Sequence, residues 1–171
     1  EPVLEAAAAA NSALRRGSPY RSVYAVIDVG AGTSDFGIFY CVEPKGGSLR
    51  IAEIKGGHVV VRQAGDRIDK LVKDNILEKE RISETDQEYQ RLRYSLERDR
   101  RVLKENLFNM SYIEHTLENE STVRLTLSEF LQDERVRNFE QLLKKKFRDA
   151  LNCLGSDWYK MVQGRIKIVF T

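Results

Sequence analysis

Two aspartates flank a glycine-rich segment at residues 28–35, which read Asp-Val-Gly-Ala-Gly-Thr-Ser-Asp. Gly30 and Gly32 permit backbone torsions and a close ligand approach that a Cβ atom would block. Successive N–H groups of such a turn can point the same way and bind an anion. Asp28 and Asp35 would then lie beside a phosphate site, where a hydrated Mg²⁺ ion binds through few carboxylates, several waters and phosphate oxygens. Thr33 adds a hydroxyl donor for a terminal phosphate.

Both sides of this segment are rich in Val, Ile, Tyr and Phe, which predicts a strand, a tight turn and a second strand over residues 23–40. The simplest alternative is an ordinary hairpin whose two aspartates are solvated. A lone Gly-x-Gly would favour that alternative. Here the whole acidic and glycine-rich string lies between two strands, which is the context that phosphate binding requires.

This string resembles the second phosphate loop of the actin-like ATPase superfamily, which includes actin, sugar kinases and the seventy-kilodalton heat-shock chaperones. The chaperones read Asp-x-Gly-Gly-Gly-Thr-x-Asp, so Ala31 departs from the pattern and its methyl group would narrow the loop. The resemblance implies that the backbone of Gly30–Thr33 binds the phosphates of ATP or ADP. It also implies that Asp28 and Asp35 hold Mg²⁺ through water and act with Thr33, at the γ-phosphate, as the catalytic residues.

A helix is predicted to begin near residues 63–69, because Ile68, Leu71, Val72 and Ile76 form an apolar face at helical spacing. The chaperones read Gly-Gly-x-x-x-Asp here; Gly65 and Asp69 match, and Ala64 replaces the first glycine. Gly65 would bring the free N–H groups of a helix N-terminus to phosphate. Asp69 either lies near the nucleotide or is a first-turn acid favoured by the helix dipole.

A long charged helix is predicted over Glu84–Asn106, with leucines at near-helical spacing as its buried stripe. One polar face of this helix carries Glu97, Arg100, Arg101 and Lys104. Such a face is ordinarily solvated. The chaperones, however, carry a helix reading Arg-Leu-x-x-x-x-Glu-x-x-Lys-Arg-x-Leu-Ser that grips adenine and ribose. The resemblance implies that these four side chains contact the nucleotide, with the Arg101 guanidinium stacked on the base and Lys104 in place of the serine.

The remaining pattern predicts a strand over residues 49–54, a turn at Gly56-Gly57-His58, a hairpin over 110–127 and a helix capped by Ser128. His58 is interpreted as an ordinary loop histidine, because no companion His or Cys lies nearby in the sequence. The last helix carries an apolar face and is followed by a closing strand at 166–170. That face comprises Leu131, Phe139, Leu142, Leu143, Phe147 and Leu151. Trp158 and Tyr159 are expected to cap the core, and an Ala-rich helix is expected before residue 17.

The order of these segments resembles the chaperones along nearly the whole chain. It implies an α/β fold: a ribonuclease-H-like (actin-like ATPase) mixed sheet with flanking helices, formed by residues 1–80 and 128–171. Residues 81–127 would form a small helix-and-hairpin subdomain over the nucleotide cleft. The function implied is that of the second lobe of a heat-shock-chaperone-like ATPase domain, whose parent hydrolyses ATP while this piece alone does not. The alternatives are a non-catalytic regulatory or assembly module, favoured by Ala31, Ala64 and Lys104, and an actin-like polymerising protein.

Composition is consistent with that interpretation. The chain has 171 residues, 42% of them hydrophobic and 32% charged, with a net charge of only +2, which argues against nucleic acid or a membrane surface as partner. Cys41 and Cys153 lack metal-ligand spacing; buried thiols in a reducing, cytoplasmic compartment and a disulfide are both open. The chain begins with Glu1 and ends in a strand, so we expect a piece of a longer protein. Its partners would be a nucleotide and, in the parent, co-chaperone or nucleotide-exchange proteins.

Overall fold

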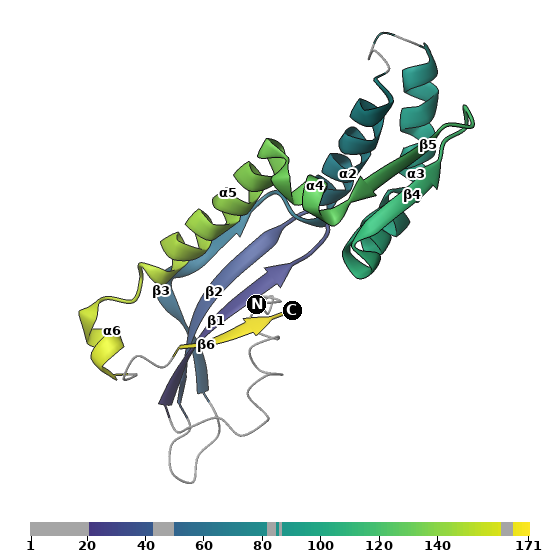
Figure 1. The fold of residues 1–171 in the computed structure, drawn as a ribbon. Helices are drawn as coiled ribbons and strands as arrows, with labels where there is room; N and C mark the ends of the chain where they lie inside the picture. Colours follow the sequence, from purple (N-terminus) through teal and green to yellow (C-terminus); the bar gives the residue numbers. More distant parts are fainter. Residues whose placement is uncertain (1–20, 43–49, 82–84, 86, 162–165) are drawn as a thin grey trace. The chain divides into compact units, whose positions relative to one another are not determined.

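The computed structural model describes residues 21–42, 50–81, 85, 87–161 and 166–171 (Figure 1). The helix expected before residue 17 lies outside these ranges. The chain divides into two units. The first takes in the described residues up to Ala64 and those of Leu142–Thr171, and the second is Gly65–Gln141. The second unit therefore begins earlier and ends later than the expected subdomain of residues 81–127.

The first unit is built on a four-stranded sheet (Figure 1). Its strands are β1 (Arg21–Val29), β2 (Ser34–Val42), β3 (Arg50–Val61) and β6 (Ile166–Phe170), in the spatial order β3-β2-β1-β6. The β1–β2 and β2–β3 pairs are antiparallel, and β6 is parallel to β1. The sheet is therefore mixed, and the predicted α/β class with a mixed sheet and flanking helices is confirmed at this level.

Side chains alternate between the two faces of this sheet, as the pleat requires. One face packs against the second part of helix α5 (Glu134–Leu151) and against helix α6 (Ser156–Met161). Its buried strand residues include Val23, Ala25, Phe36 and Ile38. Trp158 of α6 meets Tyr40 edge to face, with ring centroids 5.1 Å apart, so its predicted role in covering the core is confirmed. The other face buries Tyr24, Val26, Phe39 and Cys41, with Ile51 and Val169 packed against them.

Strand β3 corrects the prediction of a turn at Gly56-Gly57-His58. The strand continues through these residues, and its register against β2 shifts between Gly37 and Phe39. Gly56 has a φ of 81°, in the left-handed region that favours glycine. A Cβ atom on Gly57 would lie 2.8 Å from the Ile38 Cβ atom, so a larger residue does not fit. The two glycines thus form a bulge inside one strand, where the sequence pattern suggested a reversal of the chain.

The second unit contains two helices, a hairpin, a short helix and the beginning of α5. In order these are α2 (Gly65–Glu80), α3 (Gln87–Met110), β4 (Tyr112–Thr116), β5 (Thr122–Thr126) and α4 (Leu127–Gln132). The predicted leucine stripe of α3 is buried, and it packs in one core with apolar residues of α2, the hairpin and α4. The hairpin is confirmed. Helix α3 begins at Gln87 and extends to Met110, later at both ends than predicted.

The prediction of one helix capped by Ser128 is wrong. Thr126 caps α4, because its extended backbone lets the side-chain oxygen accept from the Glu129 N–H, while the Glu129 carboxylate accepts from the Thr126 N–H in return. Helix α4 ends at Gln132, and α5 begins after Asp133. This break interrupts the expected apolar periodicity, so Leu131 is 49% exposed and Phe130 is the buried residue of α4.

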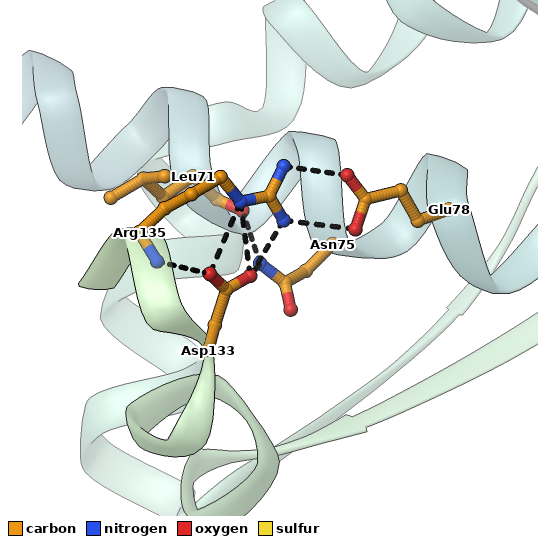
Figure 2. A network of polar contacts seen from close by, with 5 residues as sticks. All are labelled: Leu71, Asn75, Glu78, Asp133 and Arg135. Atoms are coloured by element: carbon orange, nitrogen blue, oxygen red, sulfur yellow. Dashed lines mark hydrogen bonds and ion pairs between the residues drawn. The ribbon is translucent and has the colours of Figure 1, made fainter. Parts of the chain in front are cut away.

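Asp133 caps the N-terminus of α5 and links it to α2 (Figure 2). Its Oδ1 atom accepts a hydrogen bond of 2.7 Å from the Arg135 N–H, which is an N-cap contact. The Arg135 guanidinium donates to Asp133 and to both carboxylate oxygens of Glu78, and Asn75 donates to Asp133 at 2.8 Å. The Arg135 hydrogen bond holds the pKa of Asp133 well below its usual range. The beginning of α5 is therefore joined to α2 by a charged network.

Candidate functional site

The predicted phosphate loop is the tight connection between β1 and β2, in the first unit. Its turn closes with a hydrogen bond of 2.9 Å from the Gly30 N–H to the Thr33 carbonyl. Residues 30–33 are exposed, and the strands leave the turn in register. The strand–turn–strand prediction is confirmed.

Asp28 and Asp35 are directly opposite each other in the β1–β2 ladder. Opposite residues of an antiparallel pair project from the same face, with Cβ atoms about 4.5–5.5 Å apart. By the alternation of the strands, this is the face of Tyr24 and Phe39, and not the face that packs against α5. Like charges placed opposite each other destabilise a sheet. A cation bound between these two carboxylates would remove that repulsion.

The donor set of this pair fits magnesium. Among the residues that the structure describes, no group of three or more His, Cys, Asp or Glu side chains is arranged to hold a metal ion. A dedicated protein cage is not what Mg²⁺ requires, because the ion keeps several waters and binds through one or two carboxylates together with substrate phosphates. Asp28 and Asp35 beside an exposed turn have the chemistry of such a site.

The backbone conformation at positions 30 and 32 does not require glycine. Neither has a positive φ. A Cβ atom on Gly32 would meet nothing within 4 Å, and one on Gly30 would make only ordinary contact with the Thr33 carbonyl oxygen at 3.5 Å. The turn therefore does not use the unusual torsions that the two glycines would permit. The open space in front of Gly32 leaves room for a ligand to approach the backbone.

Ser34 anchors the loop from inside. Its side chain is fully buried, and its hydroxyl donates a hydrogen bond of 2.9 Å to the Gln63 carbonyl. This contact joins the predicted phosphate loop to the segment that precedes α2. Sequence reasoning missed Ser34, although a hydroxyl between Thr33 and Asp35 was a visible signal.

His58 lies beside the acidic pair. Its Nε2 atom is 3.4 Å from Asp35 Oδ1, and both side chains are 26% exposed. It belongs to strand β3, so its interpretation as a loop histidine is wrong. No local sequence pattern indicated this contact, because the two residues come from different strands.

The other predicted site residues belong to the second unit, where α2 and α3 exchange charged contacts. Lys104 Nζ lies 2.6 Å from Asp69 Oδ1, and the Asp69 side chain is only 7% exposed. Arg100 lies 4.0 Å from the carboxylates of Asp69 and of Asp66, the latter in the turn that begins with Gly65. Asp69 is in the second turn of α2, so the first-turn interpretation of this residue is wrong, and Asp66 is the acid of the first turn.

Glu97 completes this network through Lys73, a buried lysine of α2 that sequence reasoning missed. Glu97 accepts hydrogen bonds from Lys73 and from Arg100. The Lys73 hydrogen bond is the main reason why the pKa of Glu97 is lowered. No spacing within one helix indicated this contact, because Lys73 and Glu97 come from different helices.

Arg101 does not join this network. Its side chain is 81% exposed and pairs with Glu105 of its own helix, at 2.8 Å. The predicted polar face of α3 is therefore divided. Glu97, Arg100 and Lys104 meet α2, and Arg101 extends into solvent.

A comparison of the chain with protein-family models found no match, and neither did a comparison with curated proteins. Within the described ranges, none of the helices combines the length and the apolar character needed to cross a membrane.

Proposed function

We propose that this chain is the second lobe of the ATPase domain of a heat-shock-chaperone-like protein, with the ribonuclease-H-like fold of the actin-like ATPases. The observation that carries the proposal is the pair of carboxylates, Asp28 and Asp35, directly opposite each other at an exposed glycine-containing turn. The open space at Gly32 supports it, because a phosphate can approach the backbone there.

In this function the residues position charge and do no covalent chemistry. Magnesium, when bound, neutralises part of the negative charge of the phosphates. The carboxylates of Asp28 and Asp35 would accept hydrogen bonds from its water shell. The backbone N–H groups of Ala31, Gly32 and Thr33 would donate to phosphate oxygens, because the Gly30 N–H already closes the turn. Thr33 donates to the terminal phosphate. By the resemblance, Arg100 and Arg101 of α3 would contact a nucleoside.

The test is isothermal titration of the full-length protein with ATP, with and without Mg²⁺. We expect magnesium-dependent binding that Asp28→Asn weakens by at least about tenfold, because the variant keeps the shape of the side chain and removes its charge. Asp157→Asn, at an exposed position of α6, is the matched control and should bind as the wild type does. Failure of the folded wild-type protein to bind ATP in either condition would contradict the proposal.

The second candidate is a non-catalytic regulatory or assembly module that keeps this fold. It is favoured by the contact between Lys104 and Asp69, because a cation already paired with a buried carboxylate is less available to a nucleotide. This candidate predicts a folded parent that binds ATP weakly, or binds it without hydrolysis. Measuring phosphate release alongside the titration separates the two candidates.

A further inference from the structure

The bulge in β3 decides which residues share a face with Asp35. Gly37 pairs with His58 and Phe39 pairs with Glu53, so β3 places three more residues in this stretch than β2 does. An odd shift of register exchanges the two faces of a strand. Before the bulge Glu53 is opposite Phe39, and without it Gly57 would fall opposite Asp35. With it, Val60 falls there and His58 becomes the diagonal neighbour of Asp35 on the same face.

This bulge imposes conformational requirements on the chain. Gly56 adopts a left-handed backbone conformation, and Gly57 is packed so tightly that a Cβ atom would collide with Ile38. Bulges are frequent next to active sites, where they redirect a side chain. Here the redirected polar side chain is His58, whose Nε2 atom lies 3.4 Å from Asp35 Oδ1.

We propose that His58 is a positioning residue for Asp35. Its imidazole holds Oδ1 of the carboxylate and leaves the other oxygen for the water shell of the magnesium–nucleotide complex. The inference rests on the proposed function of Asp35 and adds a residue to that site. The contact of 3.4 Å is longer than the usual N–H···O distance of about 2.9 Å. We expect this contact to shorten to a hydrogen bond when the magnesium–nucleotide complex binds.

The alternative explanation is that the bulge serves only to turn Val59 and Val61 into the core, with His58 a passive neighbour. The two explanations differ in what they require of the side chain at position 58. A positioning role requires an N–H donor at the place of Nε2. A passive role requires no hydrogen-bond donor at that place, and at most a side chain of similar volume.

Four variants of the full-length protein separate these explanations in titrations with ATP and Mg²⁺. His58→Ala should weaken magnesium-dependent binding by about tenfold or more, as loss of a partner that orients a ligand-binding carboxylate typically does. His58→Gln places an N–H donor near the position of Nε2 and should restore most of the affinity. His58→Asn is too short and should not. Val60→Ala, on the same face and directly opposite Asp35, is the control and should bind normally.

The outcomes distinguish this inference from the function it rests on. No magnesium-dependent binding by the wild-type protein would overturn the proposed function, and the role of His58 with it. Normal binding by His58→Ala, in a protein whose Asp35→Asn variant binds poorly, would overturn the role of His58 alone. Equal weakening by Ala, Gln and Asn, accompanied by equal loss of thermal stability, would also overturn it in favour of a structural role.

A second readout needs no nucleotide. In protein labelled with ¹⁵N in its histidines, the imidazole signals of His58 should shift in the Asp35→Asn variant, because the partner of Nε2 changes. The signals of His115, which belongs to β4 in the other unit, should stay in place. Unchanged His58 signals would overturn the contact.

Discussion

Lys104 of α3 and Asp69 of α2 form a contact of 2.6 Å around a carboxylate that is 7% exposed. Arg100 approaches the same carboxylate at 4.0 Å, so two residues predicted to recognise a nucleotide also hold two helices together. A structural role and a ligand-binding role make different demands on Lys104 and on Arg101, its neighbour on the helix.

The first prediction concerns this pair. Lys104→Met should destabilise the contact between α2 and α3 by about 1–3 kcal/mol, because it leaves the buried Asp69 carboxylate without its nearest cation. Hydrogen exchange of the amides of α2 and α3 measures this local effect. Arg101→Met is the control, and since Arg101 is 81% exposed it should leave the protection of these amides nearly unchanged. Equal protection in the two variants would contradict the interpretation.

The second prediction compares two glycines. Gly57→Ala should lower the free energy of unfolding by about 1–3 kcal/mol, since its Cβ atom would lie 2.8 Å from Ile38 Cβ and 2.9 Å from the Ile54 carbonyl oxygen. Gly32→Ala should leave that free energy within about 0.5 kcal/mol of the wild-type value, because the added Cβ atom would meet nothing within 4 Å. If the turn binds phosphate, Gly32→Ala should nevertheless weaken ATP binding. Chemical denaturation and titration of both variants check this, and unchanged affinity for Gly32→Ala would remove the role of the turn.

The third prediction concerns pH. Arg135 holds the pKa of Asp133 below its usual range. The ionised Asp133 therefore contributes its full stabilisation of the folded state at any pH above the unfolded pKa of about 4. This stabilisation is lost as the pH falls from about 4 through the lower folded value. Asp133→Asn keeps an oxygen acceptor for the N-cap but removes the charge. The wild-type protein should therefore exceed the variant in stability at pH 7 and pH 5, and the difference should shrink below about pH 4.

Denaturation of both proteins at several pH values measures this difference. Asp157→Asn, in an exposed position, is the matched control and should differ little from the wild type at any pH. A difference between wild type and Asp133→Asn that does not change between pH 7 and pH 3 would show that the charge of Asp133 does not contribute.

Local patterns predicted the elements whose cause is local. The β1–turn–β2 segment and the leucine stripe of α3 follow from alternation and helical spacing, and both are present. The continuation of β3 through Gly56 and Gly57 was not predictable, because the same two glycines suit a turn and a bulge equally, and packing against Ile38 decides between them. The capping of α4 by Thr126 rather than Ser128 has a similar cause, since both residues can cap a helix and the end of strand β5 selects the first.

The site divides in the same way. The placement of Asp28 opposite Asp35 follows from two strands joined by a tight turn, and was therefore predictable from the local sequence. The contact of His58 with Asp35 depends on the register of a third strand. On α3, residues three positions apart look equivalent in the sequence, yet α2 covers Lys104 and leaves Arg101 exposed. Tertiary packing decides which of them is available to a ligand.

The last prediction uses two neighbouring hydroxyls of the phosphate loop. Ser34→Ala removes the hydrogen bond that the buried Ser34 hydroxyl donates to the Gln63 carbonyl. It should lower stability by about 1 kcal/mol and raise hydrogen exchange in residues 30–35. Thr33→Ala, at an exposed position, should leave stability and exchange nearly unchanged but weaken ATP binding if its hydroxyl meets the terminal phosphate. The opposite result would be a loss of stability in Thr33→Ala and a loss of affinity alone in Ser34→Ala. That result would reverse the roles assigned to these adjacent residues and place the ligand on the inner side of the loop.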